Sequence, residues 1–275
     1  MFAKVSYTWS MMGESWRVLK QDKELLVFPL FSVIALILVT ASFAWPIFRN
    51  EELMASLKAQ EEAPGVVHYV ILFGFYFINY FVMTFFNAAI VDSAAMRMRG
   101  GDPTVRSGLK GAMSCLPQIF AWALVAATVG LILRIVEDKS KFVGKIVVGI
   151  LGIAWSLMTF LVVPVLVLEK IGPIDAAKRS TALLKKTWGE QIVGNFSFGV
   201  VFLLLGIPGF LVVAWGMANA LWVLVALGVI YLILLGLINS ALSVIFQTLV
   251  YLHASDRPLA EGVDRSLVEQ AMEVK

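Results

Sequence analysis

The sequence is poor in the residues that most often carry chemistry. Its 275 residues include one cysteine and two histidines, and 15% are charged, where a soluble domain has about a quarter. The single cysteine, Cys115, excludes a disulfide within the chain and any cysteine-rich metal site. The histidines, His68 and His253, stand in no metal-binding spacing. These shortages predict that the chain has no metal site and is not a secreted, disulfide-bonded domain.

Motifs for catalysis and cofactor binding are missing as well. The sequence has no Gly-x-Ser-x-Gly nucleophile elbow, no Gly-x-x-x-x-Gly-Lys phosphate loop and no dinucleotide-binding glycine fingerprint. Acidic residues gather at Glu51, Glu52, Glu61 and Glu62, a charge run typical of a solvated loop. We therefore expect no catalytic residues, no cofactor and no enzyme activity.

What the chain has in excess is apolar sequence. Sixty per cent of its residues are hydrophobic and its mean hydropathy is +0.86. A bilayer core of about 30 Å needs about 20 apolar residues per spanning helix. The long runs are apolar throughout, whereas barrel strands alternate apolar and polar residues. The sequence therefore predicts an all-α, polytopic membrane protein with six spans, at about residues 25–48, 66–91, 116–136, 142–168, 192–215 and 220–252. The last run is too long for one bilayer crossing, so we expect it to tilt or to continue as a helix into water.

The distribution of lysine and arginine predicts the orientation. If the N-terminus faces the cytoplasm, sixteen of the 22 lysines and arginines fall on the cytoplasmic side and six on the other. The first 24 residues are charged and show no cleavable signal, so the first apolar run is expected to remain as a span. Both termini are therefore predicted to be cytoplasmic.

An amphipathic, cationic segment, Gly172 to Glu190, lies between the fourth and fifth spans. Its apolar residues recur at helical spacing, at Ile174, Ala177, Thr181, Leu184 and Trp188, and its cations take the other face. Such a helix is expected to lie at the inner leaflet, near anionic headgroups. The predicted lipid contacts are Lys178, Arg179, Lys185, Lys186 and Trp188.

Similar segments precede the other odd-numbered spans. Residues 1–24 have an apolar face at Val5, Trp9, Met12, Trp16 and Leu19, and "GDPTVRS" before the third span resembles "GPIDAAKRS" before the fifth. A third copy, "DRPLAEGVDRS", begins the expected cytoplasmic tail at residues 253–275. We expect three transmembrane hairpins, each preceded by an amphipathic interfacial helix.

Polar residues within the spans leave two interpretations open. One set is Asn79, Thr84 and Asn87 in the second span, and the other is Asn239, Ser243 and Gln247 along one face of the sixth. They hydrogen-bond helices together, or they line a hydrophilic path.

Prolines and glycines add structural expectations for the fourth to sixth spans. Pro164 and Pro208 are expected to kink the fourth and fifth spans. Two glycine pairs are expected to let helices approach closely, Gly144 with Gly149 and Gly199 with Gly206.

Three strings resemble a known family. They are "SWRVLKQDKELLVFPL" at residues 15–30, "AWSLMTFLVVPVLVLEKIGPIDAAKRS" at 154–180 and "LLKKTWGEQIVGN" at 183–195. They are similar to an uncharacterised prokaryotic family of six-span membrane proteins, a domain of unknown function. The likeness extends more distantly to the membrane domain of glycerophosphoryl diester phosphodiesterases. It implies the cytoplasmic membrane of a prokaryote and carries over no activity and no catalytic residue.

The sequence favours a non-enzymatic membrane component that organises membrane, binds lipid of the anionic inner leaflet or scaffolds other proteins. A transporter or channel for a small or lipid-like solute is the alternative. No nucleic-acid partner is expected, while a protein partner or a second copy of the chain stays open. The substrate, the oligomeric state and the physiological role do not follow from the residues.

Overall fold

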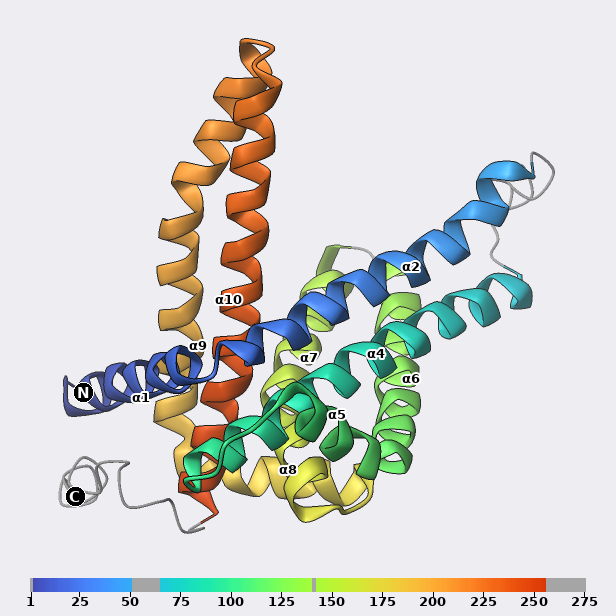
Figure 1. Ribbon diagram of the computed structural model, residues 1–275. Coiled ribbons are helices and arrows are strands. Elements are labelled where there is room, and N and C mark those ends of the chain that lie inside the picture. Colours follow the sequence, from blue (N-terminus) through green and yellow to red (C-terminus); the bar gives the residue numbers. More distant parts are fainter. Residues whose placement is uncertain (1, 51–64, 140–141, 256–275) are drawn as a thin grey trace. The chain divides into compact units, whose positions relative to one another are not determined.

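The computed structural model describes residues 2–50, 65–139 and 142–255, and every regular element in them is a helix (Figure 1). The predicted all-α class is confirmed. The helices are α1 (Phe2–Gln21), the 3-10 turn η1 (Lys23–Leu26), α2 (Val27–Arg49), α4 (Val66–Met98), α5 (Val105–Ser114), α6 (Leu116–Lys139), α7 (Phe142–Met158), α8 (Val162–Glu169), α9 (Pro173–Ala218) and α10 (Trp222–Ala254).

Six helical stretches in the described residues are long and apolar enough to cross a membrane. They are Lys23–Pro46, Val66–Met98, Leu116–Asp138, Gly144–Glu169, Val201–Ala218 and Trp222–Ala254. The six predicted spans are therefore confirmed as helices. The sixth is one helix of 33 residues, about 50 Å at 1.5 Å per residue, which exceeds the hydrocarbon thickness.

The chain divides into two compact units. Unit 1 comprises Met1–Pro29, Ile90–Gly108 and Leu183–Lys275, and unit 2 comprises Leu30–Ala89 and Leu109–Ala182. The predicted tail from residue 256 onward and the acidic loop at 51–64 lie outside the described residues.

In unit 1, α1 packs against α10. Its buried stripe is Met11, Ser15, Val18 and Leu19, at helical spacing. Trp16 is 43% exposed because it lies on the opposite side of the helix from that stripe. The buried face of α1 is therefore rotated away from the apolar face predicted for residues 1–24, which included Trp16. Leu19 is buried as expected. The side chains of Val5 and Trp9 lie outside the described residues.

The α9–α10 hairpin of unit 1 is held by close backbone approach. A Cβ at Gly228 would lie 2.6 Å from Val213 Cγ2 and 3.2 Å from the Gly209 carbonyl oxygen. Pro208 has no N–H for the Leu204 carbonyl, and the neighbouring Leu205 carbonyl accepts a hydrogen bond from the Tyr231 hydroxyl at 2.8 Å. The outer surface of the hairpin is apolar and exposed, as at Leu203, Phe210, Trp215, Trp222 and Val223. This surface suits lipid.

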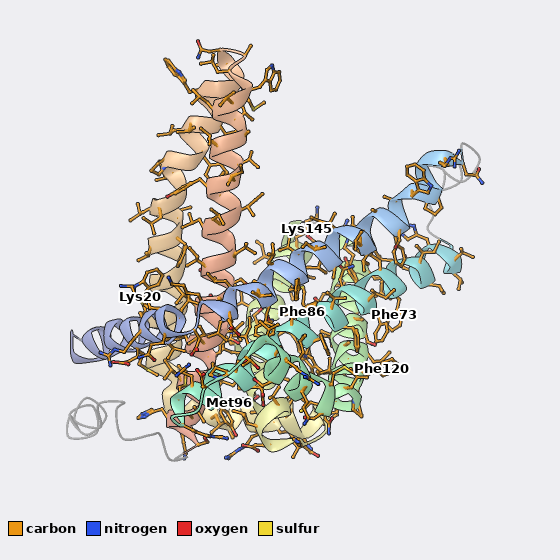
Figure 2. All side chains as sticks on the ribbon, viewed as in Figure 1. Lys20, Phe73, Phe86, Met96, Phe120 and Lys145 are labelled. Carbon is orange, nitrogen blue, oxygen red and sulfur yellow. The ribbon has the colours of Figure 1, made fainter. Side chains whose placement is uncertain are left out.

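In unit 2, aromatic contacts join the spans. Phe31 of α2 packs near Phe86 of α4, and Phe120 of α6 meets Phe77 edge to face with ring centroids 5.1 Å apart. Phe86 and Phe120 are labelled in Figure 2. Trp122 of α6 stacks on Trp155 of α7 with centroids 5.8 Å apart. Such pairs stabilise beyond the area that they bury.

The fourth span is interrupted in the helix that the sequence predicted to kink. Helix α7 ends at Met158 and α8 begins at Val162. Pro164 cannot donate a hydrogen bond, and its ring crowds the carbonyl four residues earlier. The buried N–H of Leu161 instead donates to the Ser180 hydroxyl of α9 at 3.1 Å. A side chain thus satisfies a backbone donor that lipid could not.

The segment between the fourth and fifth spans and the fifth span itself form one helix, α9, of 46 residues. Its buried residues near the start are Ala176, Ser180, Leu183 and Leu184, while Ile174 is exposed. Leu184 is buried as predicted, but the rest of the predicted apolar face is displaced, because the burial follows 176, 180 and 183 rather than 174, 177 and 181. The side chain of Trp188 lies outside the described residues.

Candidate functional site

A network of charges joins three segments of unit 1, and we call it the polar junction: Asp22, Glu24, Arg97, Asp102 and Thr104. Asp22 lies between α1 and η1, and its side chain is only 7% exposed. Arg97, near the end of α4, donates through Nε and Nη2 to the two carboxylate oxygens of Asp22, and Nη2 also contacts Asp102. A bidentate guanidinium is the geometry that best compensates a buried carboxylate.

The start of α5 completes the polar junction. Thr104 and Ser107 cap the helix reciprocally: the Ser107 N–H donates to Thr104 Oγ1 at 3.1 Å, and the Thr104 N–H donates to Ser107 Oγ at 2.8 Å. The Val105 N–H donates to Glu24 Oε2 at 3.0 Å. The carboxylate of Glu24 also lies favourably at the positive end of the helix.

The turn between α4 and α5 depends on glycine. Gly100 follows the last turn of α4 with a φ of 84°, the left-handed conformation that glycine adopts without strain. A Cβ at Gly101 would lie 2.8 Å from Met96 Cγ and 3.2 Å from the Met96 carbonyl oxygen. These two glycines let the chain turn sharply enough to bring Asp102 onto Arg97.

A cavity of about 350 Å³ opens beside the polar junction, lined by residues 20–24 and 102–104. We call it the junction pocket. Lys20 lines it, with Nζ 5.7 Å from the centre of the Trp16 ring. The pocket is polar and is lined by both signs of charge, from residues 20–24 at the α1–η1 junction and residues 102–104 before α5.

The predicted lipid-contact residues lie on α9. Lys178, Arg179, Lys185 and Lys186 are all exposed, and we call them the basic face. Lys178 Nζ lies 3.5 Å from Asp175 Oδ1, and Arg179 Nε lies 3.1 Å from Glu169 Oε1 at the end of α8. Exposed ion pairs such as Lys178 with Asp175 add little stability.

The intramembrane polar residues fall into separate units. Asn79 in unit 2 donates to the Phe75 carbonyl of its own helix at 2.7 Å, and Thr84 is buried. Asn239, Ser243 and Gln247 are half-buried on α10 in unit 1. The hydrogen bond of Asn79 is internal to α4 and joins no two helices. The path, or the contact, between the two sets stays a prediction, as does the role of Asn87.

In residues 2–50, 65–139 and 142–255, no group of three or more His, Cys, Asp or Glu side chains could hold a metal ion. Cys115, between α5 and α6, is buried, with Sγ 3.7 Å from the Val167 carbonyl oxygen of α8, a weak donor–acceptor contact.

Sequence reasoning missed the polar junction. A signal was present: acidic residues immediately precede the first span and Arg97 ends the second, and consecutive spans bring these ends to the same face of a membrane. Charges flanking adjacent spans on one side are therefore candidates for pairing, and Asp22 with Arg97 is such a case.

The chain matches the model of one protein family. The model of a family of unknown function, DUF6159, matches residues 66–260 and so covers α4 to α10. No curated protein matches the chain. The likeness to the membrane domain of glycerophosphoryl diester phosphodiesterases therefore stays a prediction.

Proposed function

We propose a function from the charged surface of the protein. The chain belongs to DUF6159, a family of unknown function, so the family supplies no activity from which to argue. The proposal is a non-enzymatic, multi-pass membrane protein that gathers anionic lipid at the inner leaflet and through it organises membrane or scaffolds partners. The observation that carries it is the exposed basic face of α9, on the same continuous helix as the fifth candidate span.

Helix continuity gives the basic face its significance. Because Pro173–Ala218 is one helix, Lys185 and Lys186 lie about four turns before the span that begins at Val201. Each Lys or Arg that lies near an anionic membrane surface contributes about 1 kcal/mol. The exposed Ile174 beside these cations supplies an apolar contact of the kind that interfacial helices use.

The location and orientation belong to the same proposal. More lysines and arginines fall on the membrane face that holds the N-terminus than on the other face. This excess supports cytoplasmic termini in the plasma membrane of a prokaryote. The absence of catalytic motifs from the sequence supports a non-enzymatic role. A protein partner or a second copy would bind as part of this organising role.

Transport of a small or lipid-like solute is the second candidate. The interruption between α7 and α8 favours it, because broken spans build many transporter sites. Against it, Leu161 at the break is fully buried and its N–H is already bound by Ser180. Solvent access to Asn87 and Asn239, measured by cysteine labelling, would favour transport.

The test of lipid gathering is charge reversal at three lysines. We expect the full chain in mixed bilayers to restrict spin-labelled phosphatidylglycerol more than phosphatidylcholine, and Lys178→Glu/Lys185→Glu/Lys186→Glu to abolish that preference. Arg179 is left in place because it pairs with Glu169. Lysine-to-arginine changes at the same positions are the control and should keep the preference. An unaltered preference in the reversed variant would show the proposal to be wrong.

A further inference from the structure

We infer that the junction pocket binds the zwitterionic headgroup of a phosphoethanolamine lipid. The inference rests on the proposed lipid-binding role and deepens it, because it assigns a second headgroup class to a site separate from the basic face. The phosphate would lie between Lys20 and Lys23, and the ammonium group would be bound by Asp102 and Glu24.

The lysines of the pocket are available for a phosphate. Among the described residues, neither Lys20 nor Lys23 forms an ion pair, and both are exposed. Lys20 stacks over Trp16, an arrangement that holds its ammonium group beside an aromatic ring. Two ammonium groups on neighbouring turns can donate charge-assisted hydrogen bonds to one phosphate.

The carboxylates of the pocket are partly engaged. Asp102 contacts Arg97 through Oδ1, and Glu24 accepts the Val105 N–H through Oε2. In the described part of the chain these bonds use one oxygen of each carboxylate. The other oxygen of each remains to accept a hydrogen bond from an ammonium group, and the Asp102 side chain is 87% exposed.

The balance of charge selects a zwitterion over a simple ion. The positive charges of Lys20, Lys23 and Arg97 equal the negative charges of Asp22, Glu24 and Asp102. A bare phosphate would meet Asp102 and Glu24, and a bare amine would meet the lysines, each with repulsion that offsets its attraction. A headgroup that carries both charges gains from both sets.

The pocket lies at headgroup depth. One side of the pocket contains Lys23, where the first candidate span begins, and the other side starts four residues after Met98, where the second span ends. The start of one span and the end of the next share a membrane face. Trp16 beside Lys20 is an aromatic residue of the kind enriched at that level.

The test compares headgroups on the full chain in detergent micelles, by native mass spectrometry. We expect phosphatidylethanolamine to bind about tenfold more tightly than phosphatidylcholine, whose quaternary ammonium cannot donate a hydrogen bond. Lys20→Gln/Lys23→Gln should lower phosphatidylethanolamine affinity about tenfold, and Asp102→Asn should remove the preference over phosphatidylcholine. Lys110→Gln, an exposed lysine of α5 outside the pocket, is the matched control and should change neither.

Several results would overturn the inference. They are equal affinity for the two lipids, an equal loss in Lys110→Gln, or displacement by inorganic phosphate as effective as that by free phosphoethanolamine. The last result would indicate a soluble anion as the ligand. Reversal of the three basic-face lysines should leave phosphatidylethanolamine binding intact. Loss of the phosphatidylglycerol preference alone therefore reports on the basic face, and loss of the phosphatidylethanolamine preference alone reports on the junction pocket.

Discussion

Asp22 is a charged side chain that the fold buries, and one arginine compensates it. The two groups are 75 residues apart in sequence, with Arg97 on α4 and Asp22 between α1 and η1. Removing one member of a buried pair costs more than the pair contributes, because the other charge is left without a partner. The Asp22–Arg97 contact therefore fixes the end of α1 to the end of α4.

Arg97→Met should destabilise the protein by about 3 kcal/mol, since methionine keeps the packing of the aliphatic stem but strands the Asp22 carboxylate. Denaturant unfolding in mixed micelles, followed by tryptophan fluorescence, measures the loss. The control is Asp102→Asn, which alters the exposed partner of the same arginine and should change stability by less than about 0.5 kcal/mol. Equal losses in the two variants would contradict the argument.

At the scale of the helix, close approach in the α9–α10 hairpin depends on particular glycines, and the sequence did not indicate which ones. Gly149 and Gly199 were expected at contacts, yet a Cβ at either would meet no described atom within 4 Å beyond its own helix backbone. Gly206 would meet Phe210 of its own helix. The close contacts are at Gly209, Gly216 and Gly228, because only the register of the hairpin decides which glycines face the partner helix.

Two glycines of α10 should respond in opposite directions to alanine. Gly228→Ala places a methyl group 2.6 Å from Val213 Cγ2 and against backbone of α9, so we expect a loss of about 1 to 3 kcal/mol. Gly236 has nothing within 4 Å, so Gly236→Ala should stabilise the helix by about 0.5 to 1 kcal/mol. Thermal unfolding of both variants in one detergent provides the comparison. A stabilised Gly228→Ala protein would refute the packing.

For the whole molecule, the orientation can be tested with single cysteines. Cys115 is buried, so the native chain is the unlabelled background. Asn219 in the α9–α10 turn and Arg106 on α5 are both exposed, and the charge distribution predicts that they lie on opposite sides of the membrane.

Asn219→Cys should react with a membrane-impermeant maleimide in intact bacterial cells, and Arg106→Cys should react only after permeabilisation. Labelling after permeabilisation provides the control for accessibility of each cysteine. The reverse pattern would invert the topology and would place the basic face and the junction pocket on the outer leaflet.

The sequence by itself determined that the chain is helical and suited to a membrane, because length and hydropathy are properties of each segment and need no knowledge of its neighbours. It also indicated strain near Pro164, since a missing N–H is local chemistry. Only the tertiary structure decided that Asp22 meets Arg97, that Ser180 satisfies Leu161 and that Trp16 faces outward. These depend on helix rotation and on contacts between distant segments, and a rotation of one residue, 100°, moves a side chain from the buried face to the exposed one without changing the apolar pattern.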